Sequence, residues 1–390
     1  MRCQKSWEIG FKLGISYAGR GWKASFSKFE WILSLDAVAL SLAGIALIYS
    51  ATVPLGPAGK SFVIKQTAWL GMGLILLVLF SFLDYRLLER WGIWIYIIIL
   101  VALISVSVFG RITAGSRRWI DFGLMRFQPS EFAKLAVVIV LARSLSESQR
   151  GSIDSWLELF KHAAFVLIPA FFIATQPDLG TAIVLSLVAL TMVLFAGLSK
   201  KLCKVIFGLA LASLPMLYFG AKYLLLDYQK KRLLTFLNPD YDPLGAGYQI
   251  IQSQIAVGSG GLFGKGFLKG TQNQLMFLPV KHTDFVFAVL SEEWGFLGSS
   301  IVLTLFLIFI LRGLGIAGRS RDDFGTFLSV GCVSIIFWHV AINVSMVMGL
   351  IPVVGVPLNF LSYGGSSLLS SFMCAAALAS VSSRRFSHLS

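Results

Sequence analysis

The sequence predicts an all-α polytopic membrane protein with about ten transmembrane helices and a large extracytoplasmic loop between spans seven and eight. Hydrophobic residues make up 56% of the 390 residues, and charged residues only 13%. Apolar runs of about twenty residues, the length that crosses a bilayer, recur along the whole chain. A soluble domain of this size needs far more polar surface, so the composition excludes that class.

The positions of the apolar runs and their flanking charges predict the individual spans. They fall near residues 31–51, 65–83, 91–109, 129–146, 160–175, 177–198, 202–222, 284–312, 324–350 and 360–382. The chain therefore divides into a basic amino-terminal arm (1–29), a membrane domain (30–383) that includes the large loop (223–283), and a short tail (384–390).

The distribution of positive charge predicts the orientation of the spans. The net charge is +14, but the basic residues are scattered through short loops instead of gathering on one face, which argues against a nucleic-acid partner. The arm has no apolar h-region, so it is not a cleavable signal peptide. Ten spans place both termini on one side, and the positive-inside rule makes that side cytoplasmic.

Several basic residues nevertheless fall in connections that this topology turns outward. They are Arg111, Arg117, Arg118 and Arg126 near residues 110–128, and Lys265 and Lys281 among others in the large loop. Two explanations remain open: contact with lipid headgroups at the outer interface, or binding of an anionic ligand. Arginine binds phosphate oxygens in bidentate fashion, so Arg111, Arg117 and Arg118, with Trp119 beside them, form a candidate diphosphate clamp.

The large loop is longer than an ordinary connector, and such loops are usually functional or disordered. Tyr248, Ile251 and Ile255 recur at helical spacing, which predicts an amphipathic helix on the membrane surface. Glycines follow at 258–266, but no strand precedes them and no GK[ST] motif follows, so a nucleotide loop is excluded. Close approach of two backbones, or a hinge, explains these glycines better.

The sequence Lys281-His282-Thr283-Asp284 lies at the start of the eighth span. Thr283 or Asp284 could cap that helix, since a short oxygen side chain satisfies free N–H groups there. Alternatively, Asp284 is a general base that takes a proton from a substrate hydroxyl. The residues alone leave both readings open.

Other polar residues within the spans are candidates for the same site. Glu131 and Lys134 lie three apart on one helix face, so either they form a structural intrahelical pair or they line a substrate cavity. Asp178 suits the first turn of a helix. Glu292 and Glu293 lie about two turns below Asp284, where packing or interhelical hydrogen bonds are expected.

Segments without charge near the end of the chain predict irregular backbone at membrane depth. Residues 349–358 and 362–367 are rich in Gly, Pro and Ser, and such backbone is tolerated only where it is buried or lines a cavity. His339 and Asn343 are four residues apart in the ninth span, where they can bond each other or a neighbouring helix.

The four cysteines and four histidines are dispersed, so we expect neither a disulfide framework nor a protein metal site.

Five ordered motifs together resemble the SEDS family of bacterial shape, elongation, division and sporulation proteins. They are RFQPSEFAK at 126–134, QPDLGT at 176–181, GSGG at 258–261, HTDF at 282–285 and SYGGSS at 362–367. The sequence GTQNQL at 270–275 before FLP at 277–279 is similar to the elongation branch of the family. Val280 stands where the family pattern has an acid, and Asn359 where it has proline.

The resemblance implies a peptidoglycan glycosyltransferase of the bacterial inner membrane that polymerises lipid II for cell elongation and rod shape. It implies a class B penicillin-binding protein as transpeptidase partner, a lipid-linked nascent glycan as second substrate, and Asp284 as the essential acid. Trp119, Glu131, Lys134 and Asp178 match other positions for which the family is known. With His282 and Ser366 from the motifs, they are the other expected substrate-binding residues. Mg²⁺ or Mn²⁺ is an optional cofactor, since basic residues or a metal ion stabilise a diphosphate leaving group.

Two other functions remain open at this point. A lipid II flippase also needs a polar, basic cavity between helices. A non-catalytic scaffold for the penicillin-binding protein accounts for helix packing, although it gives no role to a lone acid at an outward helix start.

Overall fold

The computed structural model describes residues 30–109, 111–113, 116–121, 126–148, 153, 155–199, 202, 204–205, 227–243, 245–278 and 281–384. Within these residues, eight helices are long and apolar enough to cross a membrane. The protein is therefore a multi-pass helical membrane protein, as the composition predicts. The predicted arm, almost all of the predicted seventh span (202–222) and nearly all of the tail lie outside the described residues.

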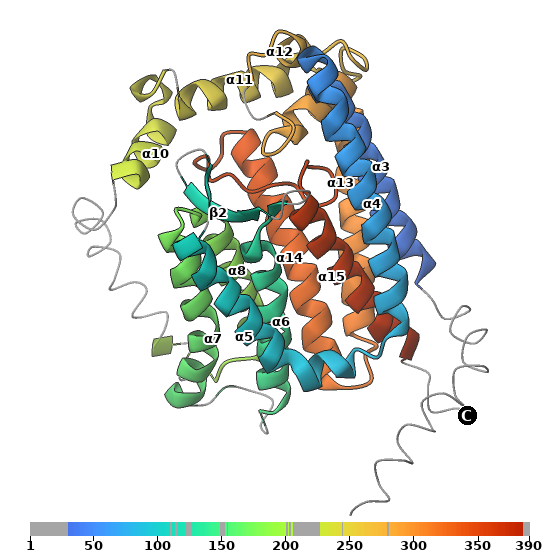
Figure 1. The fold of residues 1–390 in the computed structure, drawn as a ribbon, viewed down its shortest axis with the longest axis vertical. Coiled ribbons are helices and arrows are strands. Elements are labelled where there is room, and N and C mark those ends of the chain that lie inside the picture. The colour runs from blue at the N-terminus through green and yellow to red at the C-terminus, as the bar shows by residue number, and fades with distance from the viewer. Residues whose placement is uncertain are drawn as a thin grey trace, which may run out of the picture.

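Nine helices of the described part correspond to predicted spans (Figure 1). They are α3 (Trp31–Thr52), α4 (Pro57–Phe82), α5 (Arg86–Phe109), α6 (Pro129–Ser146), α7 (Trp156–Thr175), α8 (Leu179–Ala196), α13 (Val286–Ala317), α14 (Asp323–Val347) and α15 (Gly365–Arg384). The helix α4 begins two turns before the predicted span because Pro57 starts it, and Pro fits the first helical turn.

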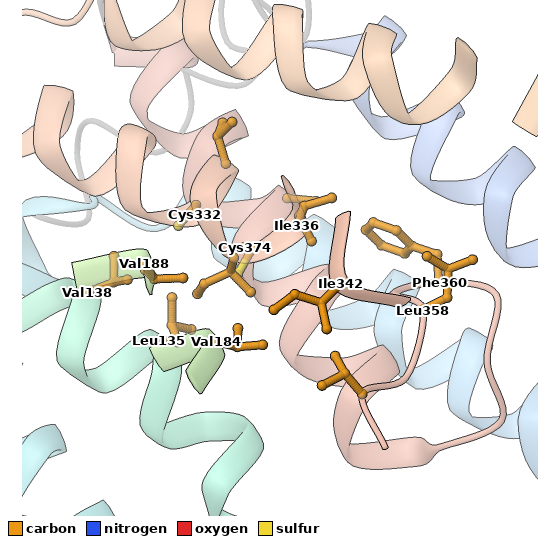
Figure 2. Close-up of a cluster of buried hydrophobic side chains, with 14 of the residues drawn as sticks. Leu135, Val138, Val184, Val188, Cys332, Ile336, Ile342, Leu358, Phe360 and Cys374 are labelled. Atoms are coloured by element: carbon orange, nitrogen blue, oxygen red, sulfur yellow. The ribbon is translucent and has the colours of Figure 1, made fainter. Parts of the chain in front are cut away.

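The centre of the bundle is built on α6, α14 and α15. The helix α6 contacts α5, α8, α14 and α15, so almost all of its residues are buried despite three charged side chains. Figure 2 shows Leu135 of α6 and Val184 of α8 packed with Cys332 of α14 and Cys374 of α15. Both of these cysteines are buried in the apolar packing and neither forms a disulfide.

The connection between α5 and α6 forms a small antiparallel sheet that the sequence analysis did not predict. Its strands are β1 (Arg111–Thr113), β2 (Ser116–Asp121) and β3 (Arg126–Phe127) in the order β1-β2-β3. They pair through Ile112 with Arg117 and through Ile120 with Phe127. The strands β1 and β3 are too short to show alternation of apolar and polar residues, and β2, with the sequence SRRWID, is long enough but does not alternate.

The large loop contains α10 (Asp227–Leu237), the 3₁₀ turn η2 (Pro239–Tyr241), α11 (Ala246–Ser259) and α12 (Thr271–Gln274). The predicted helix is thus present as α11, and α10, α11 and α12 lie across one end of the bundle (Figure 1). Ile255 on the predicted apolar face is 44% exposed. The opposite face packs on the bundle, where the Ser253 hydroxyl donates to Val347 O at 3.0 Å.

The glycine-rich segment after α11 lies against a break in α13. Gly295 interrupts that helix with φ +65°. The backbone of the segment satisfies the groups freed by the break: Lys265 N donates to Glu292 O at 3.0 Å, and Phe296 N donates to Gly261 O at 2.8 Å. This contact confirms close backbone approach as the role of the glycines, since a Cβ on Gly264 would lie 2.2 Å from Glu293 O.

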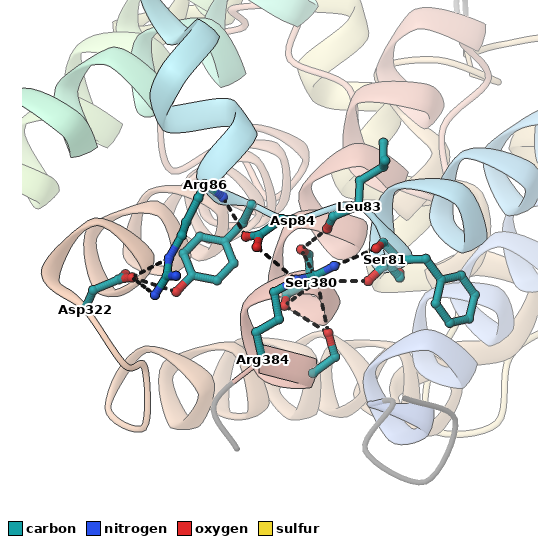
Figure 3. A network of polar contacts seen from close by, with 10 residues as sticks. Ser81, Leu83, Asp84, Arg86, Asp322, Ser380 and Arg384 are labelled. Carbon is teal, nitrogen blue, oxygen red and sulfur yellow. Dashed lines mark hydrogen bonds and ion pairs between the residues drawn. The ribbon is translucent and has the colours of Figure 1, made fainter. Parts of the chain in front are cut away.

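A polar network closes the opposite end of the bundle (Figure 3). The turn between α4 and α5 is tied to α14 by Arg86, whose Nη2 lies 3.3 Å from Asp322 Oδ2. It is tied to α15 by Arg384, whose Nη1 donates to Ser380 Oγ at 2.9 Å and whose Nε lies 3.6 Å from Asp84 Oδ2. These bonds fix the helix ends farthest from the large loop.

We expect Gly260→Ala to destabilise the protein by about 1–3 kcal/mol, the usual cost of overpacking. An added Cβ would lie 1.9 Å from Ser291 O, where backbone cannot give way cheaply. Thermal unfolding of the purified protein in detergent measures the effect. Gly258→Ala is the matched control, because a Cβ there meets no atom within 4 Å. Equal melting temperatures for the two variants would contradict the close packing at the α13 break.

Candidate functional site

A cavity of about 640 Å³ opens among the ends of the helices beneath the large loop. Its walls come from α4, β2, β3, α6, α8, the turn before α13 and the irregular segment between α14 and α15. The ionisable residues that line it are Lys65, Arg118, Asp121, Arg126, Glu131, Asp178, His282, Asp284 and Tyr363. The cavity therefore combines cations, carboxylates and aromatic rings, a mixture of apolar and polar groups that can orient a bound ligand.

Asp284 lies in the turn that precedes α13, and the segment between α14 and α15 holds this turn from one side. Tyr363 N donates to His282 O at 2.8 Å, and the Ser362 hydroxyl donates to Thr283 O at 2.6 Å. Gly355 in the same segment faces the carboxylate, since a Cβ there would lie 3.3 Å from Asp284 Oδ2. The predicted irregular backbone thus lines the cavity.

The environment of Asp284 suits proton transfer. Burial raises the pKa of its carboxyl from 3.8 to about 6, against the smaller lowering effect of a hydrogen bond with Thr283. The negative charge of Asp178 raises this pKa further, while the positive charges of Arg118 and Arg232 lower it. The N-cap position of α13 is occupied by Phe285, and no side chain caps that end. Helix capping is therefore not the role that the structure gives to Asp284.

Glu131 and Lys134 form the ion pair that their spacing predicts, and Glu131 also lines the cavity. Lys134 Nζ lies 2.9 Å from Glu131 Oε2 and 2.6 Å from His339 Nε2, with no exposed side-chain surface. His339 Nδ1 lies 2.9 Å from Pro357 O, and a carbonyl only accepts, so Nδ1 carries the proton and Nε2 accepts from the ammonium. The predicted ion pair is thus present, and of its two members only Glu131 lines the cavity.

Asp178 is the N-cap of α8 and accepts from Thr181 N at 3.4 Å. Its carboxylate also lies 3.7 Å from Arg118 Nη1, and Arg118 Nε donates to Gln176 O at 3.1 Å. Most donors of Arg118 are therefore committed to the turn before α8, which leaves little of this arginine for a diphosphate. Trp119 lines the cavity, whereas the side chains of Arg111 and Arg117 lie outside the described ones.

Three more predicted site residues, like Lys134, do not line the cavity and have partners elsewhere. Ser366 Oγ accepts from Gln128 N at 3.0 Å and so joins α15 to the start of α6. Lys265 Nζ lies 2.8 Å from Glu292 Oε1, and Lys281 Nζ donates to Asn273 O. Burial lowers the pKa of Lys281 to about 8. The two lysines lie there because Glu292 offers a buried carboxylate and the carbonyl of Asn273 in α12 accepts from the Lys281 ammonium.

Sequence analysis missed several lining residues. Lys65 of α4 is exposed, and among the described residues neither it nor Arg126 has a carboxylate partner. Phe62 packs its ring 4.9 Å from that of His282 and 5.0 Å from that of Tyr363. A cation at the outward start of a span was the available signal for Lys65. No sequence signal identified the cluster of Phe62, His282 and Tyr363 rings, because these residues are far apart in sequence.

The described carboxylates do not form a metal site. No group of three or more His, Cys, Asp or Glu side chains in the described ranges is placed to hold a metal ion. Glu131 and Asp178 are already neutralised by Lys134 and Arg118. Of the two departures from the family pattern, Val280 lies outside the described residues. Asn359 is buried, and its Oδ1 has no hydrogen-bond partner.

Comparisons with known proteins agree on one family. The model of the FtsW/RodA/SpoVE family, described as cell cycle proteins, matches residues 31–386. The peptidoglycan glycosyltransferase MrdB of Escherichia coli K12 is 43% identical over 341 residues, which cover 86% of this chain and 90% of that protein. The peptidoglycan glycosyltransferase RodA of Treponema pallidum is 35% identical over 429 residues, covering 92% and 98%.

Solved structures resemble the whole described bundle. A chain from a peptidoglycan synthase complex, studied for the coordination of polymerization and crosslinking, superposes with a TM-score of 0.75 at 30% identity. The rod shape determining protein RodA of Thermus thermophilus superposes with a TM-score of 0.67 at 28% identity. Each covers 92% of this chain and 98% of the other.

We expect Lys134→Met to lower the free energy of unfolding by about 3–5 kcal/mol, because Glu131 is then a buried charge without its partner. Neutralising both residues, as in Lys134→Met with Glu131→Gln, is expected to recover most of this loss. Denaturation of the two variants and the parent in detergent provides the comparison. A double variant no more stable than the single one would show that the charge pair is not what stabilises this position.

Proposed function

This chain belongs to the FtsW/RodA/SpoVE family and is a peptidoglycan glycosyltransferase, and we propose that it polymerises lipid II with Asp284 as the general base. The single observation that carries the proposal is a carboxylate with a pKa of about 6 in the wall of a cavity that Lys65 and Arg126 also line. A base is most effective when its pKa lies near the operating pH.

The proposed reaction is a single displacement. Asp284 takes the proton from a sugar hydroxyl of the acceptor, and that oxygen forms a bond to the anomeric carbon of the lipid-linked donor. The bond from this carbon to the diphosphate breaks, and its electron pair leaves with the diphosphate. Attack on the face opposite the leaving group inverts the anomeric centre. The leaving group is already a stable anion, so the reaction needs no protein acid.

We assign to Lys65 and Arg126 the binding of the diphosphate and the stabilisation of the negative charge that develops on it. Both line the cavity, and Arg118 beside them is largely occupied by Asp178 and backbone carbonyls. Fixed cations in a partly desolvated site stabilise the transition state more than they would in water. A requirement for Mg²⁺ or Mn²⁺ stays a prediction, and polymerisation in EDTA tests it.

The same proposal sets the orientation and the partner. The protein spans the bacterial inner membrane, and its cavity opens on the extracytoplasmic side, where glycan strands are built. Both termini then face the cytoplasm. A class B penicillin-binding protein crosslinks the product as the transpeptidase partner. The similarity to a structure of a peptidoglycan synthase complex supports this assignment.

We expect Asp284→Asn to lower polymerisation of labelled lipid II by at least about 100-fold, since an amide cannot accept the proton. For the parent protein, the rate should fall as the pH drops through about 6, because protonation removes the base. Gel analysis of glycan strands across a pH series measures both effects.

Asp240→Asn is the matched control for this experiment, because Asp240 is an exposed carboxylate in the large loop. Polymer formation by Asp284→Asn at the parental rate would contradict the base role. Lipid II movement across liposomes without polymer would favour a flippase. Normal cell-wall synthesis in cells carrying Asp284→Ala would favour a scaffold.

We expect Lys65→Gln to raise the KM for lipid II about tenfold, the effect of losing one charge-assisted contact of roughly 1.4 kcal/mol. Lys60→Gln on the same helix is the control, since Lys60 is exposed and does not line the cavity. Steady-state kinetics with lipid II at several concentrations compares the two. Equal KM values would exclude Lys65 from diphosphate binding.

A further inference from the structure

Asn343 of α14 makes a contact to the site that the mechanism above does not use. Its side chain has no exposed surface, and its Nδ2 donates to Asp284 O at 2.8 Å and to Val356 O at 2.7 Å. An amide nitrogen has two hydrogens, and here both point at carbonyl oxygens. Because carbonyls only accept, the two bonds also fix which end of the amide faces the site.

The two carbonyls belong to two separate backbone segments that meet at the Asp284 carboxylate. One is on Asp284 itself, in the turn before α13. The other is on Val356, the residue after Gly355, which faces Asp284 Oδ2 closely enough that an added Cβ would lie 3.3 Å away. Asn343 therefore sets the spacing between the backbone that carries the carboxylate and the wall that the carboxylate faces.

The other bonds to this turn do not duplicate that function. Ser362 and Tyr363 hold the two preceding carbonyls, those of Thr283 and His282. Asp284 O is the third consecutive carbonyl, and the bond to it comes from α14, one helical turn from His339, which bonds Pro357 O. Thus α14 presents two side chains to the same irregular segment, and only Asn343 also reaches the catalytic residue.

We propose that Asn343 is a positioning residue that orients Asp284 for proton transfer. The inference rests on the proposed role of Asp284 as the base. Without the amide, the bonds of Ser362 and Tyr363 still hold His282 and Thr283, but the spacing between Asp284 and residues 353–357 is no longer fixed. The carboxylate then moves away from the acceptor hydroxyl and toward solvent. The change affects the chemical step and the surroundings of the carboxylate, whereas substrate is still bound by the cations on α4 and β3.

The test compares Asn343→Ala with Ser334→Ala in the purified full-length chain with labelled lipid II. Ser334 is a matched control because it is a buried polar residue on the same helix whose hydroxyl bonds only Val330 O, at 2.7 Å. We expect Asn343→Ala to lower kcat about 10- to 100-fold with little change in KM, as a misplaced catalytic group does. Ser334→Ala should retain the parental kcat.

The pH profile separates positioning from a general structural effect. Burial is the main cause of the raised pKa of Asp284, so greater access to water should move the acid limb of kcat to lower pH. Asn343→Gln, which keeps the two donors, should restore part of the rate. If Asn343→Ala does not fold, Asn343→Ser, which keeps one donor, replaces it in the same assays.

Two outcomes would overturn the proposal. One is a parental kcat in Asn343→Ala. The other is a uniform loss of rate at every pH with an unchanged acid limb, in proportion to the loss of folded protein in thermal unfolding. Asp284→Asn is measured in parallel: if it stays active, the base role itself fails, whereas an inactive Asp284→Asn beside a normal Asn343→Ala rejects only the positioning role.

Discussion

A fully buried ammonium group, that of Lys134, constrains the centre of this bundle. A charge without water must be paired and hydrogen-bonded, or its burial is too costly to persist. Glu131 on the same helix and His339 on α14 meet that requirement, and His339 passes the constraint on to Pro357 by a second hydrogen bond. One buried cation thus links α6, α14 and the irregular segment that forms a wall of the cavity.

The same physical rule shapes the rest of the site. Irregular backbone inside a membrane protein persists only where its N–H and C=O groups have partners. Side chains provide them in the turn before α13, where Ser362 and Asn343 donate to consecutive carbonyls. Backbone provides them at the break in α13, where the glycine-rich segment bonds residues on both sides of Gly295. The Asp284 carboxylate therefore sits on irregular backbone whose carbonyls at residues 282–284 all have hydrogen-bond partners.

The basic residues separate into two groups with different roles, one structural and one in the cavity. Lys134, Arg118 and Lys265 are paired with carboxylates within the protein and hold elements together. Lys65 and Arg126 line the cavity with no carboxylate partner among the described residues. A cation already neutralised by a carboxylate adds little to the binding of a diphosphate, so the second group suits the substrate better. Net charge and position along the chain do not distinguish the two groups.

The sequence by itself determined the helical membrane fold and most of the span positions, because long apolar runs are local features. Its family motifs also singled out Asp284 as the residue to test. It also determined the Glu131–Lys134 pair, since residues three apart on a helix are neighbours whatever the fold. Only the tertiary structure decided that Lys65 joins the site, that Lys265 and Lys281 leave it, and that Asn343 holds Asp284. Those contacts join residues distant in sequence, and packing alone brings them within hydrogen-bond range.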